Sequence, residues 1–160
     1  NVDAVKWLAE EIMPNLVQLL PDVTVHILGS NPPEDVKRLE SPHLKIEGFV
    51  TDAQLEEFYA NCRLDIVPLR YGAGIKGKVV EAMRYGMPVV TTSVGAEGID
   101  GAEEILAVED DAKAFAERVA QLYGDERELA KRCKASLEYV RMHFSPENAA
   151  EVIGPEFDMK

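Results

Sequence analysis

The fold class follows from residues 64–92, which run LDIVPL, then RYGAGIKGKVVEAMRY, then GMPVVTT. The apolar run at 64–69 is typical of a buried strand, and a glycine-rich loop follows it directly. Apolar residues at helical spacing then predict a helix that continues to Tyr85, where Gly86-Met87-Pro88 ends it. The apolar run at 89–92 predicts the next strand. Strand, helix and strand in close succession indicate a parallel sheet with crossover helices.

The rest of the chain repeats this alternation. The sequence predicts further strands at 23–29, 44–50 and 105–108, and helices at 2–20, 33–41, 52–62, 110–123 and 126–143. A last short helix is expected to start at Ser145. We therefore expect an α/β protein with a Rossmann-like open parallel sheet and helices on both faces, as one domain over residues 1–160. Since such a unit normally opens on a strand, the helix at 2–20 predicts a first strand upstream of residue 1.

Composition limits the possible partners. The chain has 160 residues, 46% of them hydrophobic, which suits one globular domain. Its formal net charge of −12 disfavours binding to nucleic acid and to anionic membranes. No apolar run is long enough for a transmembrane segment. Cys62 and Cys133 belong to no metal or redox motif, so we expect reduced thiols and a cytoplasmic location.

Residues 72–77 read Gly-Ala-Gly-Ile-Lys-Gly, a literal G-x-G-x-x-G. A dinucleotide site would place this motif after the first strand, with an apolar first helical turn and an acid at the tip of the next strand. Here the motif follows the third predicted strand. Its first turn carries Lys76 and Lys78, and the next strand ends in Thr-Thr-Ser. The context therefore argues against NAD.

The alternative is a phosphate site at the start of a helix, where free backbone N–H groups and the lysines Lys76 and Lys78 attract anions. Helical phase predicts one apolar face on the helix, made of Ile75, Val79, Ala82 and Met83. The opposite side carries Gly74, Gly77 and Glu81. A carboxylate at Glu81 could accept hydrogen bonds from the vicinal hydroxyls of a ribose. Equally, Glu81 could be a solvated residue paired with Lys78 or Arg84, and the glycines could serve loop geometry alone.

Residues 68–83 together with 86–92 resemble the donor half of group 1 (family four) glycosyltransferases. Shorter similarities at 1–5, 25–29, 47–50 and 94–99 extend the resemblance along nearly the whole chain. Members of this family are retaining enzymes of the GT-B architecture, with two Rossmann-like domains around a cleft. The resemblance implies transfer of a sugar from a nucleoside-diphosphate donor to an acceptor hydroxyl, with no cofactor and no obligatory metal.

The resemblance also implies residue roles. Backbone N–H groups of Gly72, Ala73 and Gly74 would meet the donor phosphates or sugar, and Glu81 would hold the ribose. The turn Gly48-Phe49-Val50 would border the base. Lys76 and Lys78 are suggested by charge alone. Tyr71, which could stack on a ligand, and Glu97, which lies just past the fourth predicted strand, are further candidates. No catalytic residue is assigned.

The chain departs from the family pattern at one position. The wider family often carries two glutamates separated by seven residues, and the first of these would fall at Ala73. This departure concerns side-chain recognition of the donor sugar and not nucleotide binding. A branch of the family with a G-x-G-I-K-x-K signature is more similar to this chain.

The family's acceptor-binding domain lies before the region of resemblance. We therefore expect a fragment that lacks its N-terminal domain, binds nucleotide weakly and does not turn over. Two other functions stay open from the sequence: a stand-alone regulatory nucleotide-binding module, and a GT-B-like sugar-nucleotide epimerase.

Overall fold

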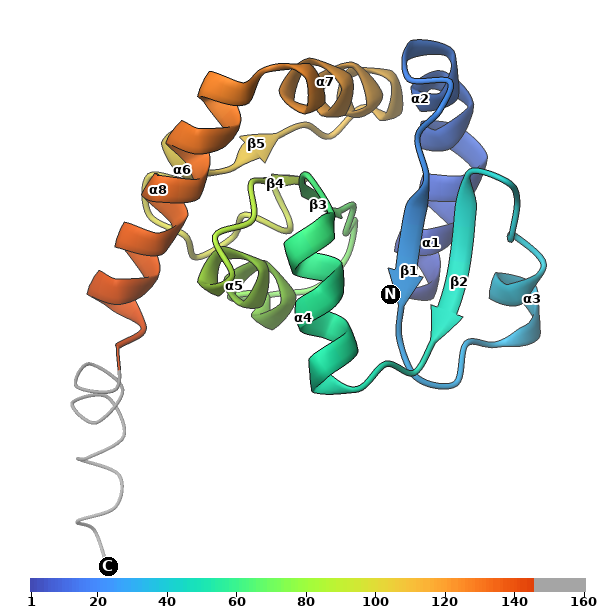
Figure 1. Cartoon of the computed structure of the whole chain (residues 1–160), viewed down its shortest axis with the longest axis horizontal. Coiled ribbons are helices and arrows are strands. Elements are labelled where there is room, and N and C mark those ends of the chain that lie inside the picture. The colour runs from blue at the N-terminus through green and yellow to red at the C-terminus, as the bar shows by residue number, and fades with distance from the viewer. Residues whose placement is uncertain (146–160) are drawn as a thin grey trace, which may run out of the picture.

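The structure is a computed structural model, and it describes residues 1–145. The short helix predicted to begin at Ser145 falls, after its first residue, outside the described residues. The chain alternates strands and helices, as the sequence predicts, and the N-terminus lies beside the carboxyl end of the first strand (Figure 1).

All paired strands are parallel, but they form two sheets. In the first sheet, β1 (Val25–Leu28) pairs with β2 (Leu44–Gly48). The second sheet has the order β3-β4-β5 and contains Asp65–Val67, Val89–Thr91 and Ala107–Val108. The predicted α/β class with parallel strands is thus confirmed. The expected single sheet is divided, because no backbone ladder joins β1 to β3 in the described part of the chain.

The helix predicted at 2–20 is interrupted. It consists of α1 (Val2–Trp7), the π-helical segment η1 (Leu8–Ile12) and α2 (Met13–Leu19). Pro14 has no N–H to donate to the carbonyl of Glu10, and its ring crowds that carbonyl, so a regular α-helix cannot pass through it. The chain instead makes a wider turn, in which the N–H of Met13 bonds to the carbonyl of Leu8.

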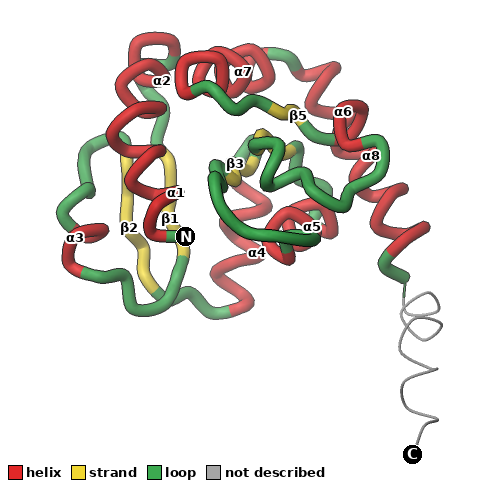
Figure 2. Tube along the Cα trace, turned by 180° about the vertical axis from the view of Figure 1, so that it is seen from behind, coloured by secondary structure: helices red, strands yellow, loops and turns green. Residues whose placement is uncertain are grey.

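Helices cover both faces of the strands (Figures 1 and 2). The remaining helices are α3 (Glu34–Lys37), α4 (Asp52–Asn61), α5 (Gly77–Arg84), α6 (Ala102–Ile105), α7 (Ala112–Gly124) and α8 (Glu126–His143). Successive residues of β4 enter different cores, since neighbouring side chains of a strand point to opposite faces. Val89 belongs to the core cluster that contains residues of α5 and partly buried residues of α8. Val90 belongs to the other cluster, with Trp7, Ile12 and Phe115 from α1, η1 and α7.

Two boundaries differ from the predictions. The strand expected at 105–108 is shorter, because Ala102 and Ile105 lie three residues apart on the buried side of the helical turn α6 while Glu103 and Glu104 face solvent. The helix after the glycine loop begins at Gly77, with Lys76 as its extended N-cap. Ile75 therefore lies outside the helix and is 50% exposed, so it does not extend the apolar face of Val79, Ala82 and Met83.

Candidate functional site

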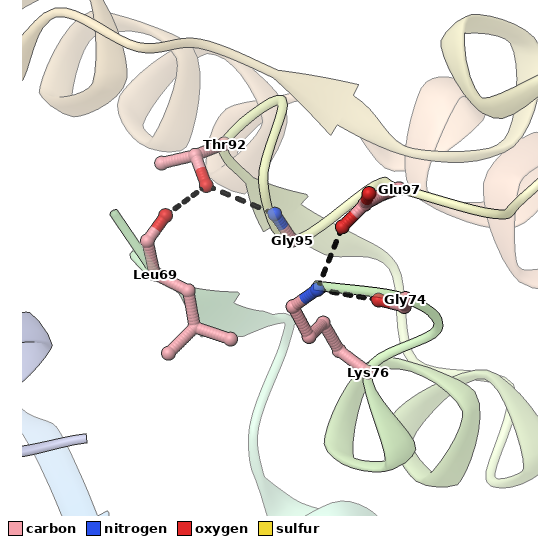
Figure 3. A network of polar contacts seen from close by, with 6 residues as sticks. All are labelled: Leu69, Gly74, Lys76, Thr92, Gly95 and Glu97. Carbon is pink, nitrogen blue, oxygen red and sulfur yellow. Dashed lines mark hydrogen bonds and ion pairs between the residues drawn. The ribbon is translucent and has the colours of Figure 1, made fainter. Parts of the chain in front are cut away.

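Two buried threonines hold the end of β3 in place: Thr91, the last residue of β4, and Thr92, which follows it. The hydroxyl of Thr91 donates to the carbonyl of Val67 at 2.7 Å. The hydroxyl of Thr92 donates to the carbonyl of Leu69 and accepts a hydrogen bond from the N–H of Gly95 at 3.1 Å (Figure 3). Thr91 and Thr92 are almost fully buried, and each hydroxyl is hydrogen-bonded to a backbone carbonyl at or just after the end of β3. These bonds fix the point from which the glycine loop departs.

Residues 93–98 make two close contacts through glycines, Gly95 with the ends of β3 and β4 and Gly98 with Ile75 of the glycine loop. A Cβ atom on Gly95 would lie 1.9 Å from the Thr91 hydroxyl oxygen, so only glycine fits there. A Cβ atom on Gly98 would lie 2.6 Å from Cγ1 of Ile75, and Gly98 has φ +80°. The backbone of the loop after β4 thus packs at Gly98 against the side chain of Ile75 in the loop after β3, so the two loops restrain each other.

The predicted phosphate loop is exposed. Gly72, Ala73 and Gly74 are all solvent-accessible, and the two glycines have φ values of +123° and +72°, which side chains other than glycine rarely adopt. Tyr71, beside them, is 72% exposed. The first N–H of α5 that bonds backward is that of Val79, which donates to the carbonyl of Lys76 at 3.0 Å. The N–H groups of Gly77 and Lys78 have no backbone partner within residues 1–145 and stay available to an anion.

Lys76 and Glu97 form a pair above this loop. The Nζ of Lys76 donates to the carbonyl of Gly74 and lies 3.1 Å from a carboxylate oxygen of Glu97 (Figure 3). The Lys76 side chain is only 10% exposed, whereas that of Glu97 is 49% exposed. The structure therefore brings together two residues that the sequence analysis singled out separately. The charge of Lys76 is directed inward, where it braces the loop and is partly neutralised.

Lys78 and Glu81 face a large cleft. The Nζ of Lys78 donates to the side-chain oxygen of Asn1 at 3.1 Å, a neutral partner, so its charge is not cancelled by that contact. Glu81 is exposed, one turn further along α5. Both side chains line a cavity of about 890 Å³ that also borders Asn1 and the ends of β1 and β3. The carboxylate of Glu81 is thus open to an approaching ligand.

Asp65, at the start of β3, lies in the wall of the same cleft. Burial raises the pKa of Asp65 to about 6 from its ordinary value of 3.8, and Glu81 adds to the rise. The backbone N–H of Ile66 and the charge of Lys78 act in the opposite direction. Burial likewise raises the pKa of Tyr59, which faces Asp65 from α4. The inner part of the cleft therefore disfavours additional negative charge.

Arg70 is a residue of the glycine loop that the sequence analysis missed. Its guanidinium donates two hydrogen bonds to the carboxylate of Asp3 in α1, at 3.0 and 2.5 Å. It also lies 5.3 Å from the ring centroid of Trp7 and 5.9 Å from that of Tyr71. Arg70 thus fastens the loop to the first helix. Asp3 and Trp7 are more than sixty residues away in sequence, so spacing gave no signal for it.

The predicted base-bordering turn lies apart from these groups. Gly48 ends β2 with φ +73°, and Phe49 is 71% exposed after it. The cleft is bordered by Gly29 to Pro33 on this side and not by residues 48–50. The role of Gly48, Phe49 and Val50 therefore stays a prediction.

Metal-ion sites and membrane-spanning helices were also sought among the described residues. Within residues 1–145 no group of three or more His, Cys, Asp or Glu side chains is placed to hold a metal ion. Over the same residues, no helix is both long enough and apolar enough to cross a membrane.

The fold is that of a Rossmann-like α/β domain, with an exposed glycine loop at a helix start. The family model described as "Glycosyl transferases group 1" matches residues 1–125, and the chain belongs to this family. The resemblance stated from residues 68–92 is thereby confirmed.

The similar proteins are longer than this chain. An uncharacterized 44.6 kDa protein in the cps region of Klebsiella pneumoniae is 28% identical over 127 residues, which are 74% of this chain and 33% of that protein. Sucrose-phosphate synthase from Thermosynechococcus elongatus superimposes with a TM-score of 0.80 at 21% identity, over 97% of this chain and 41% of its own. HepE of Anabaena, solved in complex with UDP and glucose, gives 0.73 at 20% identity, over 93% and 44%. The chain therefore spans about a third of the curated relative that it matches.

Proposed function

We propose that this domain binds the nucleoside-diphosphate-sugar donor of a glycosyl transfer reaction. The observation that carries the proposal is the arrangement along α5. Backbone N–H groups of Gly77 and Lys78 are available at the helix start, the exposed loop Gly72–Gly74 precedes them, and Glu81 faces the cleft on the same helix. Partial positive charge at the helix start suits a diphosphate, and a carboxylate one turn further along suits the hydroxyls of a ribose.

The local charges support this assignment in a chain that carries a net charge of −12. The Nζ of Lys78 donates to a neutral oxygen of Asn1 at the cleft rim, so its charge can still attract a phosphate. Asp65 lies in the cleft wall with a raised pKa, and Glu81 faces the same cleft, so hydroxyl groups are better ligands there than further anions. A nucleotide would thus be oriented with its diphosphate at the glycine loop and its sugar toward Glu81.

The remaining roles belong to the same proposal. A retaining transfer to an acceptor hydroxyl, without an obligatory metal, is what family membership suggests. We propose that an N-terminal domain supplies the acceptor site, that residues 1–160 alone bind nucleotide weakly and do not turn over, and that the protein acts in the cytoplasm. Sugar transfer by residues 1–160 alone, assayed with radiolabelled UDP-glucose, would refute the proposal that activity requires an N-terminal domain.

Isothermal titration of residues 1–160 with UDP, GDP, ADP and NAD tests the binding role. UDP is the first probe because the structurally similar HepE was solved with UDP and glucose. We expect at least one diphosphate to bind and Glu81→Ala to weaken it about 10- to 100-fold, which corresponds to the roughly 1.5–3 kcal/mol of a hydrogen bond to a charged group.

Glu138→Ala is the matched control, because Glu138 is an exposed glutamate on α8, outside the cleft lining. It should leave the affinity unchanged. Binding of NAD with no binding of the diphosphates, or equal affinity of wild type and Glu81→Ala, would overturn the proposal.

A further inference from the structure

One side of α8 is basic, although the chain as a whole is strongly acidic. Exposed charged residues recur along this helix at alternating steps of four and three, so they form one stripe. We call this stripe the basic face of α8, and it consists of Arg127, Lys131, Lys134, Glu138 and Arg141. It extends over roughly 21 Å of helix. The basic face carries a formal charge of +3, which leaves −15 on the rest of a chain whose total is −12.

The four cations of the basic face have no acidic partner. Within residues 1–145 none of them belongs to an ion pair. The two acids in the first turn of α8 are already paired, since Glu126 lies 3.3 Å from Arg63 and Glu128 lies 2.9 Å from Arg132. Glu138, on the basic face itself, is thus the one acid of α8 outside these pairs, and the face keeps its positive charge.

The opposite side of α8 fixes the helix to the molecule. A Cβ atom on Gly86, just after α5, would lie 3.1 Å from Sγ of Cys133 and 3.3 Å from Cδ1 of Leu137, so α5 and α8 are in close contact there. The hydroxyl of Tyr139 accepts a hydrogen bond from the N–H of Asp100 at 3.1 Å. Both views show α8 along the outer edge of the molecule, away from β1 and β2 (Figures 1 and 2). The basic face is therefore held outward by a helix that is itself firmly packed.

Apolar surface lies beside the cations. Leu137 is 46% exposed and lies between Lys134 and Arg141 in the helix. Lysine and arginine side chains also have apolar stems that can lie along an apolar surface while the charged end stays in water. The leaflet of an anionic membrane offers a partner for each of these groups, because headgroups carry negative charge and the acyl boundary accepts apolar side chains.

From these observations we infer that the basic face of α8 is a docking surface for an anionic lipid membrane. The net charge of the whole chain disfavours this partner, but charges more than about 8 Å apart are largely screened at physiological ionic strength. A domain of this size is roughly 40 Å across. Acids on the far side of the molecule therefore lie several screening lengths from a membrane that touches α8, and the near charges decide.

Other partners fit this face less well. Single-stranded nucleic acid sites and protein interface cores combine cations with exposed aromatic rings. Among the described residues the large exposed aromatic side chains are Phe49, Tyr71 and Tyr85, and none of them is on α8. A second copy related by a two-fold axis would bring like charges together. Contact with the acidic surface of another copy would be head-to-tail, giving rings or filaments rather than a dimer.

This inference does not rest on the proposed nucleotide binding, because α8 contributes no residue to the lining of the cleft. Cosedimentation of residues 1–160 with vesicles tests it. The vesicles are phosphatidylcholine with about one third phosphatidylserine, and phosphatidylcholine alone is the reference. We expect binding to the anionic vesicles at millimolar lipid and physiological ionic strength, and its loss in molar salt.

Substitutions locate the contact. Lys131→Gln together with Lys134→Gln should weaken vesicle binding about 25-fold, since each cation near an anionic leaflet contributes about a factor of five. Arg38→Gln together with Lys113→Gln is the matched control, because these exposed residues lie outside α8 and their loss changes the net charge equally. This control should bind as the wild type does. Glu138→Gln should strengthen binding about fivefold, a gain that loss of folding cannot produce.

Four results would overturn the inference. Absence of binding to the anionic vesicles would do so directly. Equal binding to vesicles with and without phosphatidylserine would show that the attachment is not electrostatic. Equal weakening by the two double substitutions would show that net charge, and not the basic face, governs binding. Tighter binding to duplex DNA than to the vesicles, at the same salt and the same concentration of anionic groups, would identify nucleic acid as the partner.

Discussion

At the scale of single residues, Gly95 shows how little space surrounds the loop after β4. A Cβ atom there would lie 1.9 Å from the Thr91 hydroxyl oxygen and 3.3 Å from the Val67 carbonyl oxygen. We expect Gly95→Ala to break the hydrogen bond between Thr91 and Val67 and to lower the free energy of unfolding by about 1–3 kcal/mol. Urea unfolding followed by circular dichroism measures this change.

Gly124→Ala is the control for Gly95→Ala. Gly124 ends α7 and needs no positive φ, and a Cβ atom added to it would meet no other atom within 4 Å. Its substitution should be neutral or slightly stabilising. Equal stabilities of the two variants would contradict the packing described around Gly95.

Glu97 offers a second prediction at this scale, because it partly neutralises Lys76. If Glu97 acts only through Lys76, Glu97→Gln makes the loop more positive, and UDP should bind about threefold more tightly, the effect of a typical exposed ion pair. If Glu97 also touches the donor sugar, UDP-glucose should gain less than UDP does.

Titration of Glu97→Gln with UDP and with UDP-glucose separates these contributions. Glu103→Gln, an exposed glutamate of α6, is the control and should change neither affinity. Weaker binding of UDP by Glu97→Gln would show that the carboxylate does not reduce the anion affinity of the loop.

At the scale of elements, α4 has the best-defined beginning. The Thr51 hydroxyl accepts a hydrogen bond from the N–H of Gln54 at 3.3 Å, and the Gln54 side chain accepts one from the N–H of Thr51 at 2.9 Å. This reciprocal capping box should stabilise α4, which has no fully buried residue of its own.

Thr51→Ala should therefore lower the free energy of unfolding by about 1 kcal/mol, whereas Thr51→Ser keeps the hydroxyl and should stay close to the wild type. Thermal and urea unfolding of the two variants measure the difference. The same loss in both variants would show that the methyl group, and not the cap, stabilises this end of α4.

Several elements could be predicted from the sequence and others could not. The strands at 64–69 and 89–92 and the helix between them follow from apolar spacing and from the break at Gly86 to Pro88, all of which are local signals. The π-helical turn before Pro14 was missed, although Pro14 is visible in the sequence, because continuous apolar spacing masked it. The helical turn at 102–105 was predicted in part as strand, since Ile105 begins the apolar run 105–108, and a short apolar run fits a buried strand as well as a buried helical turn.

At the scale of the whole molecule, Asp65 makes stability depend on pH. Burial raises its pKa to about 6, compared with 3.8 ordinarily, so the folded state binds this proton more tightly than the unfolded state. The free energy of unfolding should therefore fall as the pH rises through the interval between these values and level off above it. The groups that face Asp65 are Tyr59 from α4, Cys62 directly after α4, and Lys78 and Glu81 from α5.

Asp65→Asn should remove this dependence. Its free energy of unfolding, relative to the wild type, should increase between about pH 4 and pH 6 and stay constant above. Urea unfolding at a series of pH values measures the difference, and Asp100→Asn, an exposed aspartate, is the control. A constant difference between Asp65→Asn and the wild type would show that the cleft does not shift the ionisation of Asp65.

By itself, the sequence determined the α/β class, the parallel strands, the position of the glycine loop and the family, because these depend on local periodicity and on a contiguous motif. Only the tertiary structure decided that Lys76 turns inward to Glu97, that Arg70 binds Asp3 of the first helix, and that β1 and β3 line one cleft. Each of these contacts joins residues far apart in the chain. Their distances are set by how helices and strands pack, which no local pattern encodes.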